Sequence, residues 1–354
     1  MVGRQRRRSK LVALALAGAL ALSACGARGG GTASSGGDDA AEGETFTIKF
    51  SHVVTPATPK GQAAEKFKEI VEEKSEGRIT VEIYPNSELY GDPNELQALQ
   101  SNSVQMLAPS SAKFTTIAPA LQVLDLPFLF DTVEDIPDIV SPDSAAGKAI
   151  YENEELAANQ IKVMGLWDNG LKQLSSNTEM RTPENLSGLS FRIQPSDVLQ
   201  SQFESWGASS TPLAFAEVYN ALQQGVIDGQ ENPYSNIESQ NMHTVQTHIT
   251  ESNHGYVGYV LVINNEFFEG LPADLQDIVQ ESSDEASTYN REIAADLNAE
   301  ARTTIEEAGN TTILELTDEE RQVFKDAVVP SVWEQYADII GPDLVADLLA
   351  AQGQ

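Results

Sequence analysis

The amino-acid sequence predicts an α/β fold of two domains, with the chain passing between them more than once. Three observations predict it. A chain of 354 residues, 41% of them apolar, can form two separate hydrophobic cores. The first folded segment has the order strand, helix, strand, which is typical of a parallel sheet. After a second group of strands, a strand pattern at residues 255–263 indicates a return to the first domain.

The N-terminus predicts secretion. A basic stretch, MVGRQRRRSK, leads into an apolar run from Leu11 to Ala24, shorter than the ~20 residues of a membrane-spanning helix. We therefore expect residues 1–24 to be a signal peptide. The run ends in LSACG, which resembles a bacterial lipobox and predicts a lipidated Cys25 on the outer face of the cytoplasmic membrane. The alternative is an ordinary signal peptide followed by a free cysteine. Lipidation of Cys25 would leave no thiol for a disulfide, a metal or a nucleophile.

The charge balance excludes two classes of partner. The formal net charge is −31, and cleavage of the signal peptide would remove five of the 22 basic residues and leave about −36. Such a surface repels nucleic acid and anionic lipid headgroups. A small anionic ligand would therefore need local cations in its site. Screening over roughly 8 Å at physiological salt makes such a local site feasible.

The first domain is predicted from residues 46–169 and about 258–295. Residues 25–45 contain Gly, Ala, Ser and acidic residues without apolar periodicity, so we expect a flexible tether there. The folded elements expected next are a strand from Phe46, a helix after Pro56, and strands at 79–83, 104–108 and 161–167.

The second domain is predicted from residues 170–257 and about 296–354. We expect a turn at Asp168-Asn169-Gly170, where a new set of strands begins at 171–175 and 189–193. Helical periodicity then runs from Pro272 to Ala308 without proline or glycine inside it. At 1.5 Å per residue this helix would be roughly 55 Å long, enough to bridge both domains.

Signals of enzyme chemistry are sparse. The sequence contains no H-E-x-x-H, G-x-S-x-G or Walker motif, and we expect neither catalysis nor a cofactor or metal. One alternative is a periplasmic serine hydrolase of the S-x-x-K type, with Ser110 and Lys113 in SSAK. The S-D-N and K-T-G motifs that accompany S-x-x-K in penicillin-binding enzymes are absent.

Arg192 is the residue best suited to bind a carboxylate. It alternates with Phe191 and Ile193 near the end of a predicted strand, so it points away from their face. A guanidinium can bind a carboxylate through two parallel hydrogen bonds. From the residues alone, an arginine on a solvated sheet face remains the alternative. Similar alternatives remain for Lys172, for Asn232 as a turn residue, and for Phe215 as a core residue on a helix.

Two adjoining segments carry a family resemblance. FAEVYNALQ at 215–223 and GVIDGQENP at 225–233 resemble the solute-binding proteins of tripartite ATP-independent periplasmic (TRAP) transporters, and LSFRI at 189–193 and NGLK at 169–172 extend the match. The resemblance implies a periplasmic-binding-protein-like fold of two α/β domains with mixed sheets. It also implies a hinged cleft that closes over an organic acid and a long helix that spans both domains.

The resemblance also implies residue roles and partners. Arg192 and Asn232 match the family's carboxylate-binding pair, and Phe215 matches its aromatic wall. Lys172 stands where the family often has a second arginine, so a point charge replaces a planar fork. Ser110 and His52 stand at variable positions that choose the substrate. The implied protein is a monomer that delivers a small carboxylate to a TRAP membrane permease.

Overall fold

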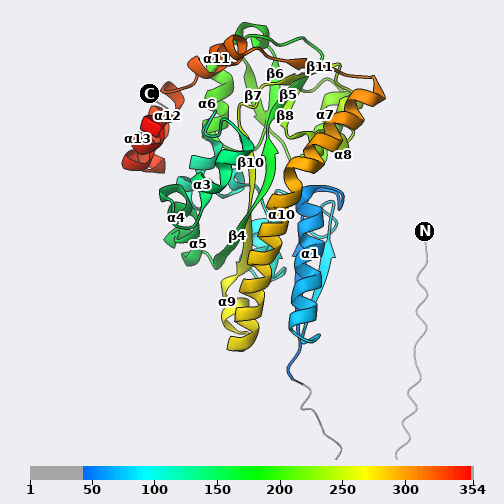
Figure 1. Ribbon diagram of the computed structural model, residues 1–354, viewed down its shortest axis with the longest axis vertical. Helices are drawn as coiled ribbons and strands as arrows, with labels where there is room; N and C mark the ends of the chain where they lie inside the picture. The colour runs from blue at the N-terminus through cyan, green and yellow to red at the C-terminus, as the bar shows by residue number, and fades with distance from the viewer. Residues whose placement is uncertain (1–42, 352–354) are drawn as a thin grey trace, which may run out of the picture. The chain divides into compact units, whose positions relative to one another are not determined.

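Residues 43–351, which the computed structural model describes, fold around two mixed β-sheets with helices packed against them (Figure 1). The predicted signal peptide, Cys25 and most of the predicted tether lie outside the described residues. In the described part, no helix is both long and apolar enough to cross a membrane.

The first sheet has the strand order β2-β1-β3-β10-β4. Its strands are β1 (Phe46–Ser51), β2 (Ile79–Tyr84), β3 (Met106–Leu107), β4 (Ile161–Leu171) and β10 (Tyr256–Asn264). β1 is parallel to β2 and β3, whereas β10 is antiparallel to β3 and β4. Helix α1 (Pro59–Lys74) joins β1 to β2, with Thr58 as N-cap and Pro59 in its first turn. The predicted strand-helix-strand start and the predicted return of the chain to this sheet are confirmed.

The second sheet has the order β11-β9-β5-β8-β6-β7. Its strands are β5 (Gln173–Ser176), β6 (Ser190–Ile193), β7 (Ser209–Pro212), β8 (Gly229–Asn232), β9 (His248–Glu251) and β11 (Thr312–Glu315). The central strand β8 is antiparallel to β5 and parallel to β6. β6 and β8, the strands that matter most for the site, are therefore interior strands.

The chain crosses from the first sheet to the second without the expected turn at 168–170. That prediction was wrong: β4 continues through Gly170 to Leu171, and only Lys172 separates it from β5. The reason is non-local, because β10 pairs with this part of β4 (Val257 with Gly170, Tyr256 with Leu171). Gly170, at φ +118°, takes up the bend inside the strand.

The long helix predicted at the C-terminal side is confirmed as α10 (Ala273–Ala308, 36 residues). It packs against α1 and β4 and, further along, against α8 (Tyr234–Ser239), which directly follows β8 (Figure 1). The side chain of Asn298 donates to the carbonyl of Asn169 (2.7 Å) and accepts from the N–H of Ser235 (3.0 Å). This one side chain ties α10 to the end of β4 and to the start of α8.

Short helices fill the connections. They are α2 (Glu95–Gln100), η1 (Ser111–Phe114), η2 (Pro119–Asp125), η3 (Val133–Asp135), α3 (Ile136–Val140), α4 (Ala145–Tyr151), α5 (Glu154–Ala158), η4 (Pro183–Leu186), α6 (Asp197–Ser205), η5 (Phe215–Glu217), α7 (Val218–Gln223), η6 (Met242–Thr244), α9 (Asn265–Glu269), α11 (Asp318–Asp326), α12 (Ser331–Ile340) and α13 (Pro342–Ala351). A hydrophobic core contains residues 124, 126 and 128–130 together with Val262 of β10 and Phe191 of β6. This core therefore includes residues from both sheets.

Candidate functional site

Arg192 lies in the interior of the second sheet. Its backbone pairs with Gln230 of β8 and Thr211 of β7, while its neighbour Phe191 stacks on Phe203 (ring centroids 4.9 Å apart). The alternation predicted for this strand therefore separates an aromatic face from the face that carries the guanidinium. The Arg192 side chain is only 1% exposed.

The buried guanidinium has no carboxylate partner. Its Nε and Nη2 atoms both donate to the carbonyl oxygen of Leu213 (3.0 and 2.8 Å), and residues 43–351 supply no ion pair to it. Burial lowers the pKa of Arg192, and the charges of Asp92 and Glu231 oppose that effect. Because an unpaired buried charge is costly, this arrangement favours a bound anion.

A small cavity of about 20 Å³ lies beside Arg192. Its walls come from elements of both sheets: Val53, Val54, Lys60, Asp92, Glu95, Ser110, Lys113, Arg192, Gln194, Phe215, Asn232, Asn236 and Tyr259. The cavity has room for about one water molecule. An organic acid can therefore enter only if the walls move apart. Four of the predicted site residues, Arg192, Asn232, Phe215 and Ser110, meet at this cavity.

Asn232 lies at the end of a strand. The alternative of a turn residue was wrong, because β5 pairs with all of Gly229–Asn232 and β6 pairs with Gly229 and Gln230. The Asn232 amide donates to Gln230 Oε1 (2.5 Å) and accepts from Asn236 Nδ2 (3.1 Å). Asn236 also donates to the hydroxyl of Tyr259 in β10 (3.3 Å). A chain of amides thus connects the second sheet to a strand of the first across the cavity.

Asp92 joins Phe215 to Lys113. Its Oδ2 accepts the backbone N–H of Phe215 (2.5 Å), and its Oδ1 lies 3.0 Å from the ammonium of Lys113. Burial acts to raise the pKa of Asp92, but Lys113, the Phe215 N–H and the charge of Arg192 outweigh it and lower the pKa. An ionised carboxylate of the protein therefore links the Lys113 side of the cavity to the Arg192 side.

Lys60 and Glu95 form the remaining charged wall. The ammonium of Lys60 donates to Ala108 O (3.0 Å) and lies 3.6 Å above the centre of the Tyr259 ring. Burial lowers the pKa of Lys60 to about 8, with Glu95 and Asp92 opposing. Burial, together with the charge of Asp92, raises the pKa of Glu95 to about 7, and Glu95 Oε1 has no hydrogen-bond partner among the described residues.

His52 and Lys172 do not line the cavity. Burial and the charge of Lys60 lower the pKa of His52 to about 3, so its ring is neutral. Lys172 donates to Glu231 Oε1 (2.6 Å), and Glu231 Oε2 lies 2.8 Å from His254 Nε2. Burial opposes ionisation of Glu231, but Lys172 and His254 lower its pKa to about 2. A direct ligand contact by His52 or Lys172 stays a prediction.

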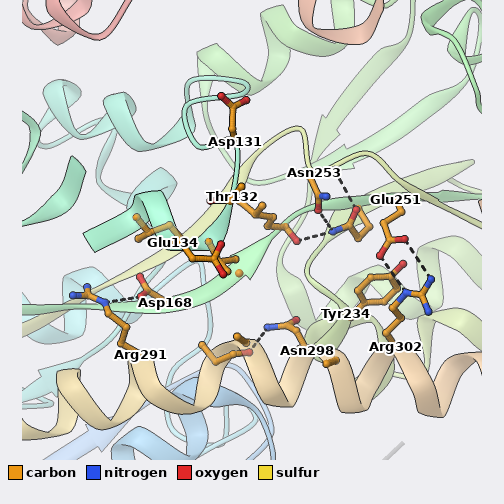
Figure 2. A pocket seen from close by; sticks show the side chains of 18 of the residues that line it. Asp131, Thr132, Glu134, Asp168, Tyr234, Glu251, Asn253, Arg291, Asn298 and Arg302 are labelled. Atoms are coloured by element: carbon orange, nitrogen blue, oxygen red, sulfur yellow. Dashed lines mark hydrogen bonds and ion pairs between the residues drawn. The ribbon is translucent and has the colours of Figure 1, made fainter. Parts of the chain in front are cut away.

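A larger pocket of about 590 Å³ lies elsewhere, between the 131–137 segment, the end of β4 and α10 (Figure 2). It shares no residue with the small cavity. Figure 2 shows that both of its arginines are already paired, Arg291 with Asp168 (2.9 Å) and Arg302 with Glu251 (3.1 Å). This pocket therefore lacks the unpaired cation that marks the small cavity. No group in residues 43–351 has the side chains to hold a metal ion.

Comparison with known proteins identifies the family. Residues 50–338 match the model of bacterial extracellular solute-binding protein family 7. The chain belongs to this family. It is 43% identical over 312 residues to the C4-dicarboxylate-binding periplasmic protein DctP of Rhodobacter capsulatus, across 88% of this chain and 92% of that protein. It is 36% identical over 315 residues to the C4-dicarboxylate-binding protein DctB of Bacillus subtilis, across 88% and 89%.

Solved structures agree with this assignment. A TRAP periplasmic solute-binding protein from Shewanella oneidensis with bound succinate superposes with a TM-score of 0.83 at 41% identity, covering 87% of this chain and 99% of that chain. One from Pseudomonas aeruginosa with bound L-malate gives 0.79 at 40% identity, covering 82% and 100%. The predicted resemblance to TRAP solute-binding proteins and the predicted two-domain fold are confirmed.

The alternative of an S-x-x-K hydrolase finds no support in this family. Lys113 forms an ion pair with Asp92, and within the described chain no hydrogen bond joins its ammonium to the Ser110 hydroxyl. A lysine held by a carboxylate is a poor base for activating a serine.

Sequence reasoning missed most of the cavity residues, among them Lys60, Asp92, Glu95 and Tyr259. Neither Asp92 nor Lys60 stands in a sequence motif that indicates a binding site. A polar residue at a position that should be buried is the usual signal. Here it was weak, because Lys60 stands in the first turn of α1, where exposure is common.

Glu95→Gln should make folding stability less dependent on pH. The folded state binds the Glu95 proton more tightly than the unfolded chain does, since its pKa rises from 4.5 to about 7. Wild-type stability therefore falls as the pH rises through that interval. Between about pH 5 and pH 8, the free energy of unfolding of the variant should therefore rise by about 1–3 kcal/mol relative to wild type. The loss of the attraction between Glu95 and Lys60 would reduce this gain.

Urea denaturation at the two pH values measures this difference. Glu88→Gln, which removes an exposed carboxylate from the same connection, is the matched control and should show no pH-dependent gain. An equal effect of Glu95→Gln at both pH values would contradict the assignment of a raised pKa to Glu95.

Proposed function

We propose that this chain captures a small dicarboxylate outside the cytoplasm and delivers it to a TRAP permease. One observation carries the proposal: Arg192 is buried beside a cavity and has no carboxylate partner among the described residues. The proposal is supported by relatives named for C4-dicarboxylate binding and by similar proteins solved with succinate and with L-malate.

The free edge of Arg192 suits a carboxylate. A guanidinium has five N–H donors, and the Leu213 carbonyl uses one on Nε and one on Nη2. Both N–H groups of Nη1 and one of Nη2 remain, which form the end-on fork that matches two carboxylate oxygens. The same carbonyl fixes the direction in which the fork points. Asn232 would add a hydrogen bond from its amide, and Phe215 would form the apolar wall.

The other predicted residues act from the opposite wall or from behind it. Ser110 lines the cavity and would offer its hydroxyl to the ligand. Lys172 would influence ligand binding indirectly, because it binds Glu231, and the negative charge of Glu231 acts to raise the pKa of Arg192. His52 precedes two cavity residues, Val53 and Val54, and would position that segment.

Binding would proceed by opening and closing of two domains. The proposed first domain comprises 46–169 with about 258–295, and the second 170–257 with about 296–354. With a cavity of about 20 Å³, the described arrangement has no room for an organic acid. The ligand would enter an open form and favour the closed one, because only the closed form offers contacts from both walls. The crossing at Lys172 and helix α10 would form the hinge.

Arg192→Ala should weaken succinate binding by about 2–4 kcal/mol, because the ligand carboxylate would be buried without its charge partner. Isothermal titration with succinate measures the loss, and Arg192→Lys should recover only part of it, since an ammonium cannot form the fork. Arg78→Ala, which removes a surface arginine paired with Asp274, is the charge-matched control. Unchanged succinate affinity in a folded Arg192→Ala protein would remove Arg192 from the site.

The protein would act as a monomer and deliver its ligand to a TRAP permease. Membrane vesicles that contain the permease subunits should take up labelled succinate only when the wild-type protein is added. Arg192→Ala should fail to support uptake. Uptake at the same rate without the binding protein would argue for a different role, such as presenting the ligand to a sensor.

Lipidation of Cys25 would hold the protein on the outer face of the cytoplasmic membrane, since more than one acyl chain gives stable anchoring. In cells, the wild-type protein should incorporate labelled palmitate and sediment with membranes. Cys25→Ser should lose the label and leave the membrane fraction, while succinate affinity stays the same. Membrane retention of the serine variant would overturn the lipid anchor.

A further inference from the structure

A second group of buried cations lines the same cavity as Arg192. Lys60 stands in the first turn of α1 and Lys113 in η1, and both side chains are almost fully buried (1% and 8% exposed). Lysine is rarely buried unless it is paired. Both belong to segments next to the first sheet, whereas Arg192 belongs to the second.

The buried ammonium of Lys60 has fewer hydrogen-bond acceptors than it has N–H donors. An ammonium has three N–H donors. Within residues 43–351, Lys60 donates one of them to Ala108 O and otherwise contacts only the face of the Tyr259 ring. No carboxylate there forms an ion pair with it, although Glu95 lines the same cavity and its Oε1 also has no hydrogen-bond partner. Lys60 thus resembles Arg192: a buried cation at the cavity with spare donors.

Lys113 has one carboxylate partner, and that partner is shared. Asp92 forms an ion pair with the Lys113 ammonium and accepts a hydrogen bond from the backbone N–H of Phe215. With three donors, Lys113 can keep Asp92 and still bind a second acceptor from the cavity. Since Asp92 is held from both walls, it also fixes where the Lys113 ammonium lies.

We propose that Lys60 and Lys113 form a second carboxylate subsite, so that a dicarboxylate lies with one end on Arg192 and Asn232 and the other end between the two lysines. This inference rests on the proposed function, and it names the residues that would distinguish dicarboxylates from monocarboxylates. Each carboxylate would bind to a different wall, so the ligand itself would hold the two walls together. Tyr259, beneath Lys60, would contact the carbon chain between the two ends.

Selectivity follows from the unsatisfied donors. A monocarboxylate of the same length could occupy Arg192 but would leave Lys60 buried without an acceptor. Sites built around buried polar groups reject ligands that leave those groups unpaired, whereas apolar pockets discriminate weakly. The lysine pair therefore selects for charge at the far end of the ligand.

A ligand–protein cycle tests the subsite directly. Titrations compare succinate with succinamate, in which one carboxylate is replaced by an amide of the same shape. The proteins are wild type, Lys60→Met and Lys113→Met, with Lys66→Met as control. Lys66 lies on the same helix α1, but its side chain is 35% exposed and pairs with Glu69 on the surface. The control removes one positive charge without touching the cavity.

Wild type should prefer succinate over succinamate by about 100-fold, as expected for a desolvated charge pair. In either lysine variant the preference should fall to about 10-fold or less through loss of succinate affinity, with succinamate affinity nearly constant. Lys66→Met should keep the wild-type preference. If Lys60→Met does not fold, the charge-balanced variant Lys60→Met with Glu95→Gln replaces it, and Lys113→Met gives an independent measurement.

Two results would overturn the subsite. One is an unchanged succinate preference in both folded lysine variants, and the other is a wild type that binds both ligands equally well. Both leave the proposed function intact, since succinate still binds. A wild-type protein that binds neither ligand nor any other dicarboxylate would instead overturn the proposed function itself.

Discussion

The hydrogen bonds from Arg192 to the carbonyl of Leu213 fix the site around which the rest of the structure is arranged. They hold a full positive charge inside the protein, on an interior strand that lines a cavity. No described carboxylate neutralises it. A buried cation without an ion-pair partner is costly, and this cost is the physical basis for proposing an anionic ligand at Arg192. Stacking of Phe191 on Phe203 holds the strand from the opposite side.

The strongly acidic surface and an anionic ligand are compatible because the two act over different distances. A net charge of −31 acts mainly through screened solvent, where interactions fade over roughly 8 Å. Three cationic side chains and two carboxylates line the cavity: Arg192, Lys60, Lys113, Asp92 and Glu95. Burial strengthens the electrostatic interactions of each of these groups. Asp92 is tied to Lys113 and to a backbone N–H, and the raised pKa of Glu95, about 7, reduces its negative charge near neutrality. The local balance is therefore positive.

Local patterns were sufficient to predict much of the fold. The first strand-helix-strand unit, helix α10 and the alternation around Arg192 are set by neighbours in sequence, and each was found as expected. The failures have a common cause. Turn-forming residues around Asn232 suggested a turn, yet β5 pairs with all of Gly229–Asn232 and β6 pairs with its first two residues, so the segment is a strand. The Asp-Asn-Gly sequence at 168–170 likewise predicted a turn, but pairing with β10 extends the strand through Gly170.

The charged wall of the cavity was beyond sequence reasoning for another reason. Lys60, Asp92 and Lys113 are far apart in the chain, and each stands where a surface residue would be ordinary. Only the packing of α1, the loop before α2 and η1 brings them together.

The Asp92–Phe215 hydrogen bond gives this packing a mechanical consequence, since it connects the Lys113 side of the cavity to the segment that carries the predicted aromatic wall. A cavity with room for about one water molecule is already closed, and this bond helps to hold it closed. If the two proposed domains separate, this bond would break, and it would re-form or be replaced when they close over a ligand. The ligand affinity would therefore depend on the free energy of closing, to which the Asp92–Phe215 bond contributes, as well as on the contacts of the ligand itself.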